Sequence, residues 1–168
     1  MSDCGLIPVD WLRERYAYHP LTGAITYRQG PSKLIGREAG YIDDKGYRVL
    51  KVTFNGRRIQ FGAHRLAWAL HHGHHPTLEV DHKDLNRSNN RLKNLRHATR
   101  SNNLANRPNT GPLPKGVTAS RSKTKPFQAQ VTIDGVYRYL GCHATAEEAH
   151  AAYLSAALPH HGEFLRVA

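Results

Sequence analysis

Carboxylate, imidazole and carboxamide side chains are concentrated between residues 78 and 106 of this 168-residue chain. Asp81 and His82 are adjacent there, and Asn94 and Asn103 follow. A carboxylate is a hard ligand for Mg²⁺ or Mn²⁺, and an imidazole with a pKa of about 6.5 can accept a proton from water near neutrality. Phosphodiester hydrolysis uses such a cation and such a base. The segment is therefore a candidate site for phosphodiester hydrolysis.

The surrounding pattern predicts the elements that would position these side chains. Residues 79–82 are expected to end a β-strand, and a polar loop separates them from a second short strand over residues 95–98. A helix is expected to begin near residues 99–101. Neighbours in a regular strand point to opposite faces, but at a strand end Asp81 and His82 can flank a single phosphate.

Two asparagines would complete this arrangement. Asn94 would bridge the loop and hold it so that His82 presents the correct tautomer. Asn103 would offer its carboxamide oxygen to the cation from the helix. If the helix begins one residue differently, Asn102 takes the ligand role instead.

An Asn-rich and Arg-rich loop could alternatively be a non-catalytic phosphate clamp, because carboxamides often hold turns through their own backbone. Asp81 would weaken such a clamp by repelling phosphate unless a cation were bound. Phosphate contacts around the site are predicted for four arginines, with a solvated basic face as the competing interpretation of each: Arg87, Arg91, Arg96 and Arg100.

The charge balance indicates a polyanionic partner. Twenty-four Lys and Arg against 13 Asp and Glu give a formal charge of +11, and residues 1–107 carry 18 of these basic side chains. Nucleic acid is favoured over membrane because no basic amphipathic helix is evident. Only Cys4 and Cys142 are present, so neither a disulfide framework nor a cysteine-based zinc site is expected.

No basic leader and no run of roughly 18 apolar residues is found, which predicts a soluble protein that is not exported. Four histidines between residues 71 and 75 could suggest a metal site, but they straddle an expected helix end. We interpret them as solvated or phosphate-facing.

Other elements follow from turn and helix signals. Asn55-Gly56 and Asp134-Gly135 supply the positive φ angles of two-residue hairpin turns. Thr145 and Glu148 stand at the spacing of a helix capping box. The elements expected outside the central segment are helices over residues 8–17, 64–72 and 146–157, strands over 24–28, 39–42 and 116–119, and hairpins over 46–62 and 127–141.

The second hairpin has two different faces. Its turn predicts the pairs Ile133 with Val136, Val131 with Arg138, and Ala129 with Leu140, which gives one largely apolar face. Polar and aromatic side chains that can contact DNA are expected on the other face: Gln128, Gln130, Thr132, Tyr137 and Tyr139. Arg121, Lys123 and Lys125 lie in a basic loop nearby.

The segment DHKDLNRSNNRLKNLRHATRSNN closely resembles the motif of HNH endonucleases of the phage-encoded and homing type. The resemblance implies a ββα-metal unit in which Asp81 and Asn103 bind the cation, His82 is the general base and Asn94 is the central Asn. The last position is His in the namesake pattern and Asn here, so Mg²⁺ or Mn²⁺ is expected rather than Zn²⁺.

Residues 115–164 resemble the AP2 DNA-binding domain, with YLG at 139–141 and ATAEEAHAAYLSAA at 144–157 as the most specific parts. The resemblance implies a three-stranded sheet plus a helix, with the sheet in the major groove of double-stranded DNA. DNA-facing positions would be Arg121, Gln130, Thr132, Tyr137 and Tyr139. Phe127 stands where the family usually has Trp, so modest affinity is expected from this module alone.

We therefore expect an α+β protein with an N-terminal hairpin and helix region, an HNH unit and an AP2-like domain. The expected boundaries are 1–107 (HNH core about 64–107), a linker at 108–115, and 116–168. The expected function is metal-dependent DNA nicking by a monomer in the cytoplasm of a bacterial or phage-infected host cell, with no protein partner indicated. The alternative is a non-catalytic, sequence-specific DNA-binding regulator with a degenerate HNH unit.

Overall fold

The computed structural model describes residues 7–166, so Cys4 lies outside the described part of the chain. Contacts divide the protein into an N-terminal unit, Met1–His97, and a C-terminal unit, Ala98–Ala168. The expected linker at residues 108–115 thus falls inside the C-terminal unit. Helices and small sheets occur in both units, in agreement with the mixed α and β composition expected. None of the described helices is long and apolar enough to cross a membrane.

The N-terminal unit is built on a three-stranded sheet of order β3-β4-β5. Strands β4 (Arg48–Phe54) and β5 (Arg57–Gly62) form the expected hairpin, and β3 (Tyr41–Ile42) pairs with the start of β4. Asn55 and Gly56 adopt φ angles of 47° and 74°, as a type I′ turn requires. The predicted hairpin and its turn are confirmed.

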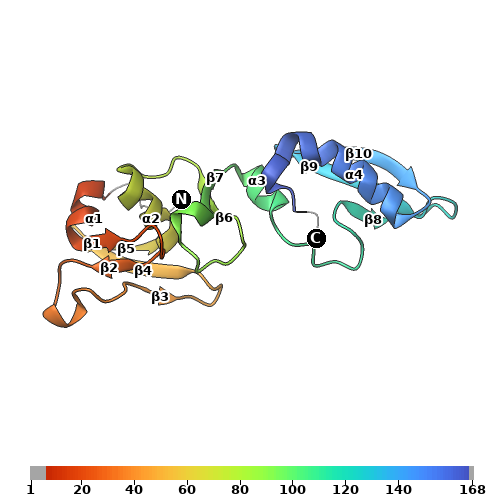
Figure 1. The fold of residues 1–168 in the computed structure, drawn as a ribbon. Helices are drawn as coiled ribbons and strands as arrows, with labels where there is room; N and C mark the ends of the chain where they lie inside the picture. Colours follow the sequence, from red (N-terminus) through yellow and green to blue (C-terminus); the bar gives the residue numbers. More distant parts are fainter. Residues whose placement is uncertain (1–6, 167–168) are drawn as a thin grey trace. The chain divides into compact units, whose positions relative to one another are not determined.

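Helices α1 (Val9–Arg15) and α2 (Ala63–His72) lie on one side of this sheet (Figure 1). Their apolar side chains, Leu12 and Leu66 among them, are buried in one core with Leu50 and Phe61 of the sheet. Gly73 ends α2 in the left-handed conformation, with a φ of 84°. The N-terminal helix was predicted to residue 17, but the chain leaves it at Arg15.

A second small sheet follows α1. Strands β1 (Tyr16–Tyr18) and β2 (Ile25–Tyr27) pair antiparallel, and the 3₁₀ turn η2 (Ser32–Leu34) comes next. Strand β1 was not predicted because its three residues continue the helical rhythm of α1 in the sequence. Tyr16 is buried in the main core, so this strand also serves the packing of the unit.

Residues 78–106 have the predicted order of strand, loop, strand and helix. Strands β6 (Glu79–His82) and β7 (Leu95–Ala98) are neighbours in a two-stranded sheet, and the 3₁₀ turn η3 (Leu92–Asn94) precedes β7. Helix α3 (Arg100–Ala105) follows and is capped by the side chain of Thr99. Most of this segment belongs to the N-terminal unit, whereas α3 belongs to the C-terminal unit.

The C-terminal unit contains a three-stranded sheet of order β10-β9-β8 and one long helix. Strand β8 spans Val117–Ala119, β9 spans Phe127–Ile133 and β10 spans Val136–His143. Helix α4 (Ala146–His161) lies along the sheet, and η4 (Gly162–Phe164) follows it (Figure 1). The cap of α4 is as expected, because the Thr145 Oγ1 accepts a hydrogen bond from the Glu148 N–H at 3.2 Å.

The alternation of side chains in β9 follows the prediction. Ala129, Val131 and Ile133 are buried, and Ala149 and Tyr153 of α4 are buried with them in the two apolar clusters of this unit. Gly116 comes so close to the Tyr153 ring that an added Cβ would lie 2.1 Å from Cδ2. The sheet therefore packs one face against the helix and leaves the other open.

The predicted pairing of Ala129 with Leu140 is wrong. The pairs of Val136 with Ile133 and Arg138 with Val131 are present, but the register shifts between Tyr139 and Cys142. Two residues of β10 face one residue of β9 at this point, which defines a β-bulge. Gly141, with a φ of 104°, supplies the unusual backbone conformation there.

Candidate active site

Strand β6 carries Asp81 and His82 into the interior of the N-terminal unit. Their exposed fractions are 7% and 4%. Val80, the residue before them, is part of the main hydrophobic core and fixes this strand end. A buried acid next to a buried imidazole costs free energy unless both are hydrogen-bonded or paired, so their partners decide what the site can do.

His82 is oriented by Asn90. The His82 Nε2 lies 3.1 Å from the Asn90 Oδ1, while the Asn90 Nδ2 donates to the backbone oxygen of Ser88 at 3.3 Å. Because the second contact directs Oδ1 towards the imidazole, the neutral ring carries its proton on Nε2 and its basic lone pair on Nδ1. The Asn90 backbone oxygen also accepts a 2.7 Å hydrogen bond from the Tyr18 hydroxyl. Asn90 therefore sets the tautomer of the candidate base, a role not predicted for it.

Burial lowers the pKa of His82, and the positive charge of Arg87 lowers it further. The hydrogen bond with Asn90 and the charges of Asp84 and Asp81 act in the opposite direction and only partly offset this effect. The ring is consequently neutral near pH 7. A neutral imidazole is the form that can accept a proton from water.

A second buried imidazole lies beside His82. The ring centroids of His64 and His82 are 5.2 Å apart, and Tyr47 lies 5.4 Å from His64 and 6.0 Å from His82. Burial, with contributions from His82 and Arg65, lowers the pKa of His64 to about 3. His64 therefore adds no positive charge next to the candidate base at neutral pH.

Gly62 makes room for the His64 ring, because an added Cβ would lie 2.6 Å from its Cε1. The residues around His82 thus come from β5, α2 and the turn before β4 as well as from the motif. His64 was predicted only as the first residue of a helix over residues 64–72, with no role in the site.

Asp81 is held by an ion pair with Arg96 of β7. The Nε and Nη2 atoms of Arg96 both lie 3.1 Å from the Asp81 Oδ2, and both side chains are buried. Arg96 was predicted to contact phosphate, but its guanidinium is directed at Asp81 inside the protein. The sequence feature that could have predicted this ion pair is the acid in β6 and the arginine in β7, which lie on the two strands that flank one loop.

Asn94 braces the loop between β6 and β7. Its Nδ2 donates to the Asp84 Oδ1 at 2.9 Å and to the Asn89 backbone oxygen at 2.8 Å, and its Oδ1 accepts from the Asp84 N–H at 3.1 Å. Burial raises the pKa of Asp84, but hydrogen bonds from Asn89 and Asn94 outweigh it and lower the pKa overall. Asp84 is thus an ionised anchor for the loop, and Asn94 is hydrogen-bonded to it at both ends of its carboxamide.

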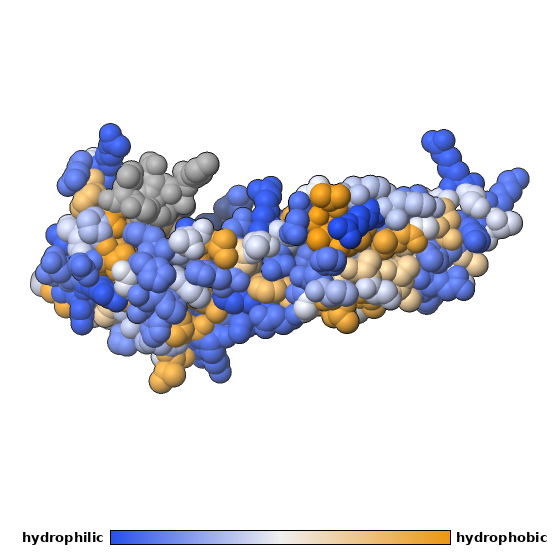
Figure 2. Space-filling view, turned by 90° about the horizontal axis from the view of Figure 1, so that it is seen from above, coloured by the Kyte–Doolittle hydropathy of each residue, from blue (hydrophilic) through white to orange (hydrophobic). Residues whose placement is uncertain are grey.

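The other predicted phosphate contacts are exposed. Arg87 extends over the Tyr47 ring at 5.0 Å and donates to the Lys45 backbone oxygen at 2.8 Å. Arg91 and Arg100 are on the surface of their respective units. In the face of the molecule drawn in Figure 2, hydrophilic residues cover much of the surface.

The two candidate carboxamide ligands lie in α3, in the C-terminal unit. The Asn102 Oδ1 is 3.0 Å from the His161 Nδ1, so this oxygen already accepts a hydrogen bond within the unit. Asn103 is the next residue of the helix, and its N–H donates to the Thr99 backbone oxygen at 2.9 Å. Asp81 belongs to the N-terminal unit. The prediction that Asp81 and Asn103 bind the same cation therefore rests on the sequence motif.

The oxygen donors of the two predicted ligands, Asp81 and Asn103, suit a hard cation. Among the described residues, no group of three or more His, Cys, Asp or Glu side chains could hold a metal ion. Mg²⁺ is commonly bound through one or two carboxylates together with waters and substrate phosphates, and it does not need a cage made only of protein. A carboxylate has two oxygens and about four lone pairs, so Asp81 can ligate a cation while its Oδ2 remains paired with Arg96.

The predicted DNA-facing residues of the C-terminal unit share the open face of its sheet. Tyr137 pairs with Thr132, and Tyr139 pairs with Gln130. The Tyr137 hydroxyl donates to the Gln130 Oε1 at 3.0 Å and accepts from the Gln128 Nε2 at 3.1 Å. Both tyrosines are 56% exposed. Arg121 and Lys123 are exposed in the loop after β8.

Two histidine rings, one from α2 and one from β7, lie against Trp68. The Trp68 ring lies 4.2 Å from His72 and 4.0 Å from His97 of β7, and the His71 and His72 rings are 4.8 Å apart. Burial, together with the neighbouring histidines, lowers the pKa of His72. These aromatic contacts lie at the end of α2, where His71, His72 and His74 remain exposed to solvent.

Residues 61–105 match the family model of the HNH endonuclease. A solved structure titled "DNA binding and cleavage by the HNH homing endonuclease I-HmuI" is 27% identical, with 74% of this chain and 71% of that chain covered and a TM-score of 0.44. No curated protein matches the sequence. The family match includes the predicted catalytic and metal-binding residues and confirms the HNH resemblance for this segment. It ends before β8, so the AP2-like character of the C-terminal sheet stays a prediction.

Proposed function

We propose that this protein is a metal-dependent DNA endonuclease that uses His82 as its general base. The observation that carries the proposal is the state of His82 within the matched segment. The ring is buried, its pKa is lowered, and the Asn90 Oδ1 accepts a hydrogen bond from the Nε2–H, so that Nδ1 is the basic nitrogen. This is the form of imidazole that general-base catalysis requires near neutral pH.

In this reaction the Nδ1 of His82 takes a proton from water while the water oxygen forms a bond to phosphorus. The bond from phosphorus to the 3′ oxygen breaks, which leaves a 5′ phosphate. Asp81 and Asn103 would hold Mg²⁺ or Mn²⁺. When bound, the cation would stabilise negative charge on the phosphate and on the leaving oxygen. Asn94 and Asn90 keep the loop and the base in place.

The C-terminal unit would supply DNA binding in the manner of an AP2-like domain. Its open sheet face presents hydroxyl and carboxamide groups suited to base edges and phosphates, and Arg121 and Lys123 add positive charge beside it. One catalytic histidine per chain favours a single-strand cut by a monomer.

The second candidate function is a DNA-binding regulator without nuclease activity. The buried ion pair favours it, because Arg96 already neutralises Asp81 and could have replaced the cation as its partner. In that case DNA binding would persist and no metal would be required.

Incubation with supercoiled plasmid separates the two functions. With Mg²⁺ or Mn²⁺, the wild-type protein should convert the plasmid to open circles, and His82→Ala should lower the rate by about 100-fold or more, the range of a lost general base. His19→Ala is the matched control, since His19 is exposed and lies outside the site. Retained gel-shift binding of plasmid with no cleavage in either metal would establish the regulator instead.

A further inference from the structure

Helix α3 is too short to be stable without tertiary contacts. It contains six residues, Arg100–Ala105, and isolated helices below about 12–15 residues are marginal in water. The conformation of Asn103 therefore depends on what holds α3. All the partners described below lie in the C-terminal unit.

The first half of α3 is attached to the hairpin turn and to the end of α4. The Ser101 Oγ accepts a 3.1 Å hydrogen bond from the backbone N–H of Asp134, the first turn residue between β9 and β10. The Asn102 Oδ1 accepts a 3.0 Å hydrogen bond from the Nδ1 of His161, the last residue of α4. His161 is only 5% exposed, so its ring is fixed by packing.

The last turn of α3 is attached at two further points. Lys115 Nζ donates to the backbone oxygens of Ala105 and Arg107, and the Arg166 N–H donates to the Ala105 oxygen at 3.2 Å. Burial lowers the pKa of Lys115, and the positive charge of Arg166 contributes. An ammonium at the C-terminal carbonyls of a helix is favourably placed.

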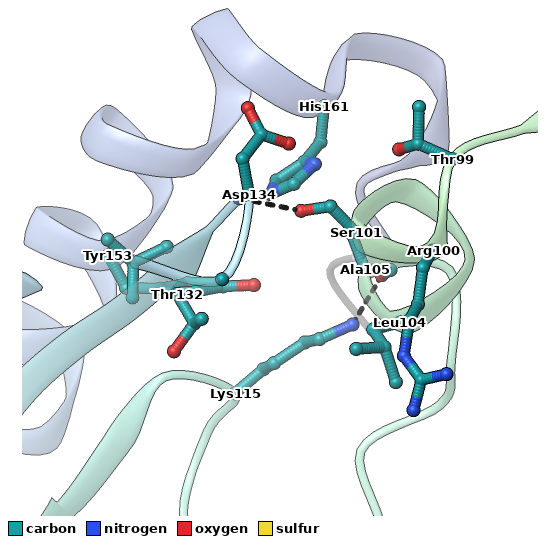
Figure 3. Close-up of a pocket in the computed structure, with 12 residues that line it drawn as sticks. Thr99, Arg100, Ser101, Leu104, Ala105, Lys115, Thr132, Asp134, Tyr153 and His161 are labelled. Carbon is teal, nitrogen blue, oxygen red and sulfur yellow. Dashed lines mark hydrogen bonds between the residues drawn. The ribbon is translucent and has the colours of Figure 1, made fainter. Parts of the chain in front are cut away.

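A cavity of about 580 Å³ lies under the helix, lined by α3, β9, the hairpin turn and α4. Figure 3 shows Ser101, Lys115 and His161 around it. Leu104 and Ala105 of α3 line this cavity, and the hydrogen bonds described above attach the helix around it.

We propose that the C-terminal unit positions Asn103 for cation binding, with Ser101, His161 and Lys115 as positioning residues that act through α3. The proposal rests on the proposed nuclease function. It adds that contacts within the C-terminal unit fix the conformation of α3 and so of Asn103, the residue proposed as a cation ligand. Strands β9 and β10 bear the open sheet face, and Asp134 is the first residue of the turn between them. The backbone N–H of Asp134 donates to Ser101 of α3.

Mn²⁺ binding tests this directly. The protein would carry His82→Ala to prevent cleavage and would be bound to a DNA duplex, and free Mn²⁺ would be measured by electron paramagnetic resonance. Ser101→Ala and His161→Ala should each weaken Mn²⁺ binding by about tenfold, as loss of groups that orient metal ligands does. His161→Gln, which keeps a donor for Asn102, should restore part of the affinity. His160→Ala, at the exposed neighbouring position, should have no effect.

Hydrogen exchange shows whether the variants act through α3. Exchange of residues 99–106 should become faster in Ser101→Ala and His161→Ala, while strands β8 to β10 stay protected and duplex affinity in EDTA stays within about twofold. Unchanged Mn²⁺ affinity in both variants would overturn the proposal. Mn²⁺ binding that is insensitive to Asn103→Ala would remove its premise.

Plasmid cleavage by the otherwise unmodified protein keeps the two hypotheses apart. A wild-type protein that cuts DNA while the Ser101 and His161 variants bind Mn²⁺ normally would refute the positioning role and leave the nuclease function intact. A wild-type protein that neither cuts DNA nor binds Mn²⁺ would refute both.

Discussion

The pKa of His82, the proposed general base, is set by opposing effects. Burial removes water from the imidazolium form and lowers the pKa, whereas the carboxamide of Asn90 and two nearby carboxylates limit the decrease. Activity should require the neutral ring. In the pH–rate profile, the midpoint of the acid limb should therefore lie below the ordinary histidine pKa of about 6.5.

Substitution of Asn90 should move this limb in a direction set by the new side chain. Asn90→Ala removes a contact that raises the pKa of His82, so the limb should shift to lower pH while the plateau rate falls about tenfold because the tautomer is no longer fixed. Asn90→Asp offers a carboxylate to the imidazolium and should shift the limb to higher pH. Nicking rates between pH 5 and 8 would measure both. Identical shifts in the two variants would show that Asn90 does not act on the titration of His82.

Asp81 and Arg96 illustrate what a residue-by-residue interpretation can miss. Both are charged residues in a basic motif, and the sequence suggested separate roles at a phosphate. The structure pairs them in the interior, where each charge offsets the desolvation cost of the other. The hydrogen bond from His82 to Asn90 was missed for a similar reason, since it depends on how the loop folds back over β6.

At the scale of elements, local signals predicted most of the fold. Asn55-Gly56 and Asp134-Gly135 placed both hairpin turns, Gly73 ended α2, and Thr145 capped α4. These features depend on the residues themselves. Strand β1 and the bulge after Tyr139 depend on pairing with other strands, which short-range periodicity does not contain. The attachment of α3 to α4 through His161 is equally non-local.

The open face of the C-terminal hairpin leads to a prediction at this scale. Tyr137→Ala and Tyr139→Ala should each weaken duplex binding by about tenfold, which corresponds to about 1.4 kcal/mol, the size of a hydrogen bond to a charged group such as phosphate. Fluorescence anisotropy in EDTA measures binding without cleavage. The unit should remain folded because both side chains are exposed.

Leu158→Ala is the matched control for this face. Leu158 is 58% exposed and lies on α4, which packs against the opposite side of the sheet. If Leu158→Ala weakened binding as much as the tyrosine variants, the DNA-binding surface would have to be placed elsewhere on the unit.

At the scale of the whole molecule, the formal charge of +11 should make DNA affinity strongly dependent on salt. Each phosphate neutralised by a Lys or Arg releases counterions, so the logarithm of the affinity falls with the logarithm of the salt concentration in proportion to the number of such contacts. Net charge alone does not reveal which Lys and Arg side chains contact phosphate. A pair of substitutions can identify them.

Arg121→Gln and Arg138→Gln remove the same charge from two different places in the C-terminal unit. Arg121 lies in the loop after β8, in the basic stretch expected at DNA, whereas Arg138 pairs with the buried Val131 and so projects on the side of α4. Arg121→Gln should reduce the magnitude of the salt slope by about 0.9, the value for one lost phosphate contact, and Arg138→Gln should leave it unchanged. Titrations in EDTA between about 50 and 200 mM salt would resolve the two slopes. Equal reductions would mean that DNA responds to the total charge of the protein, and the case for a binding face on this sheet would then rest on its tyrosines alone.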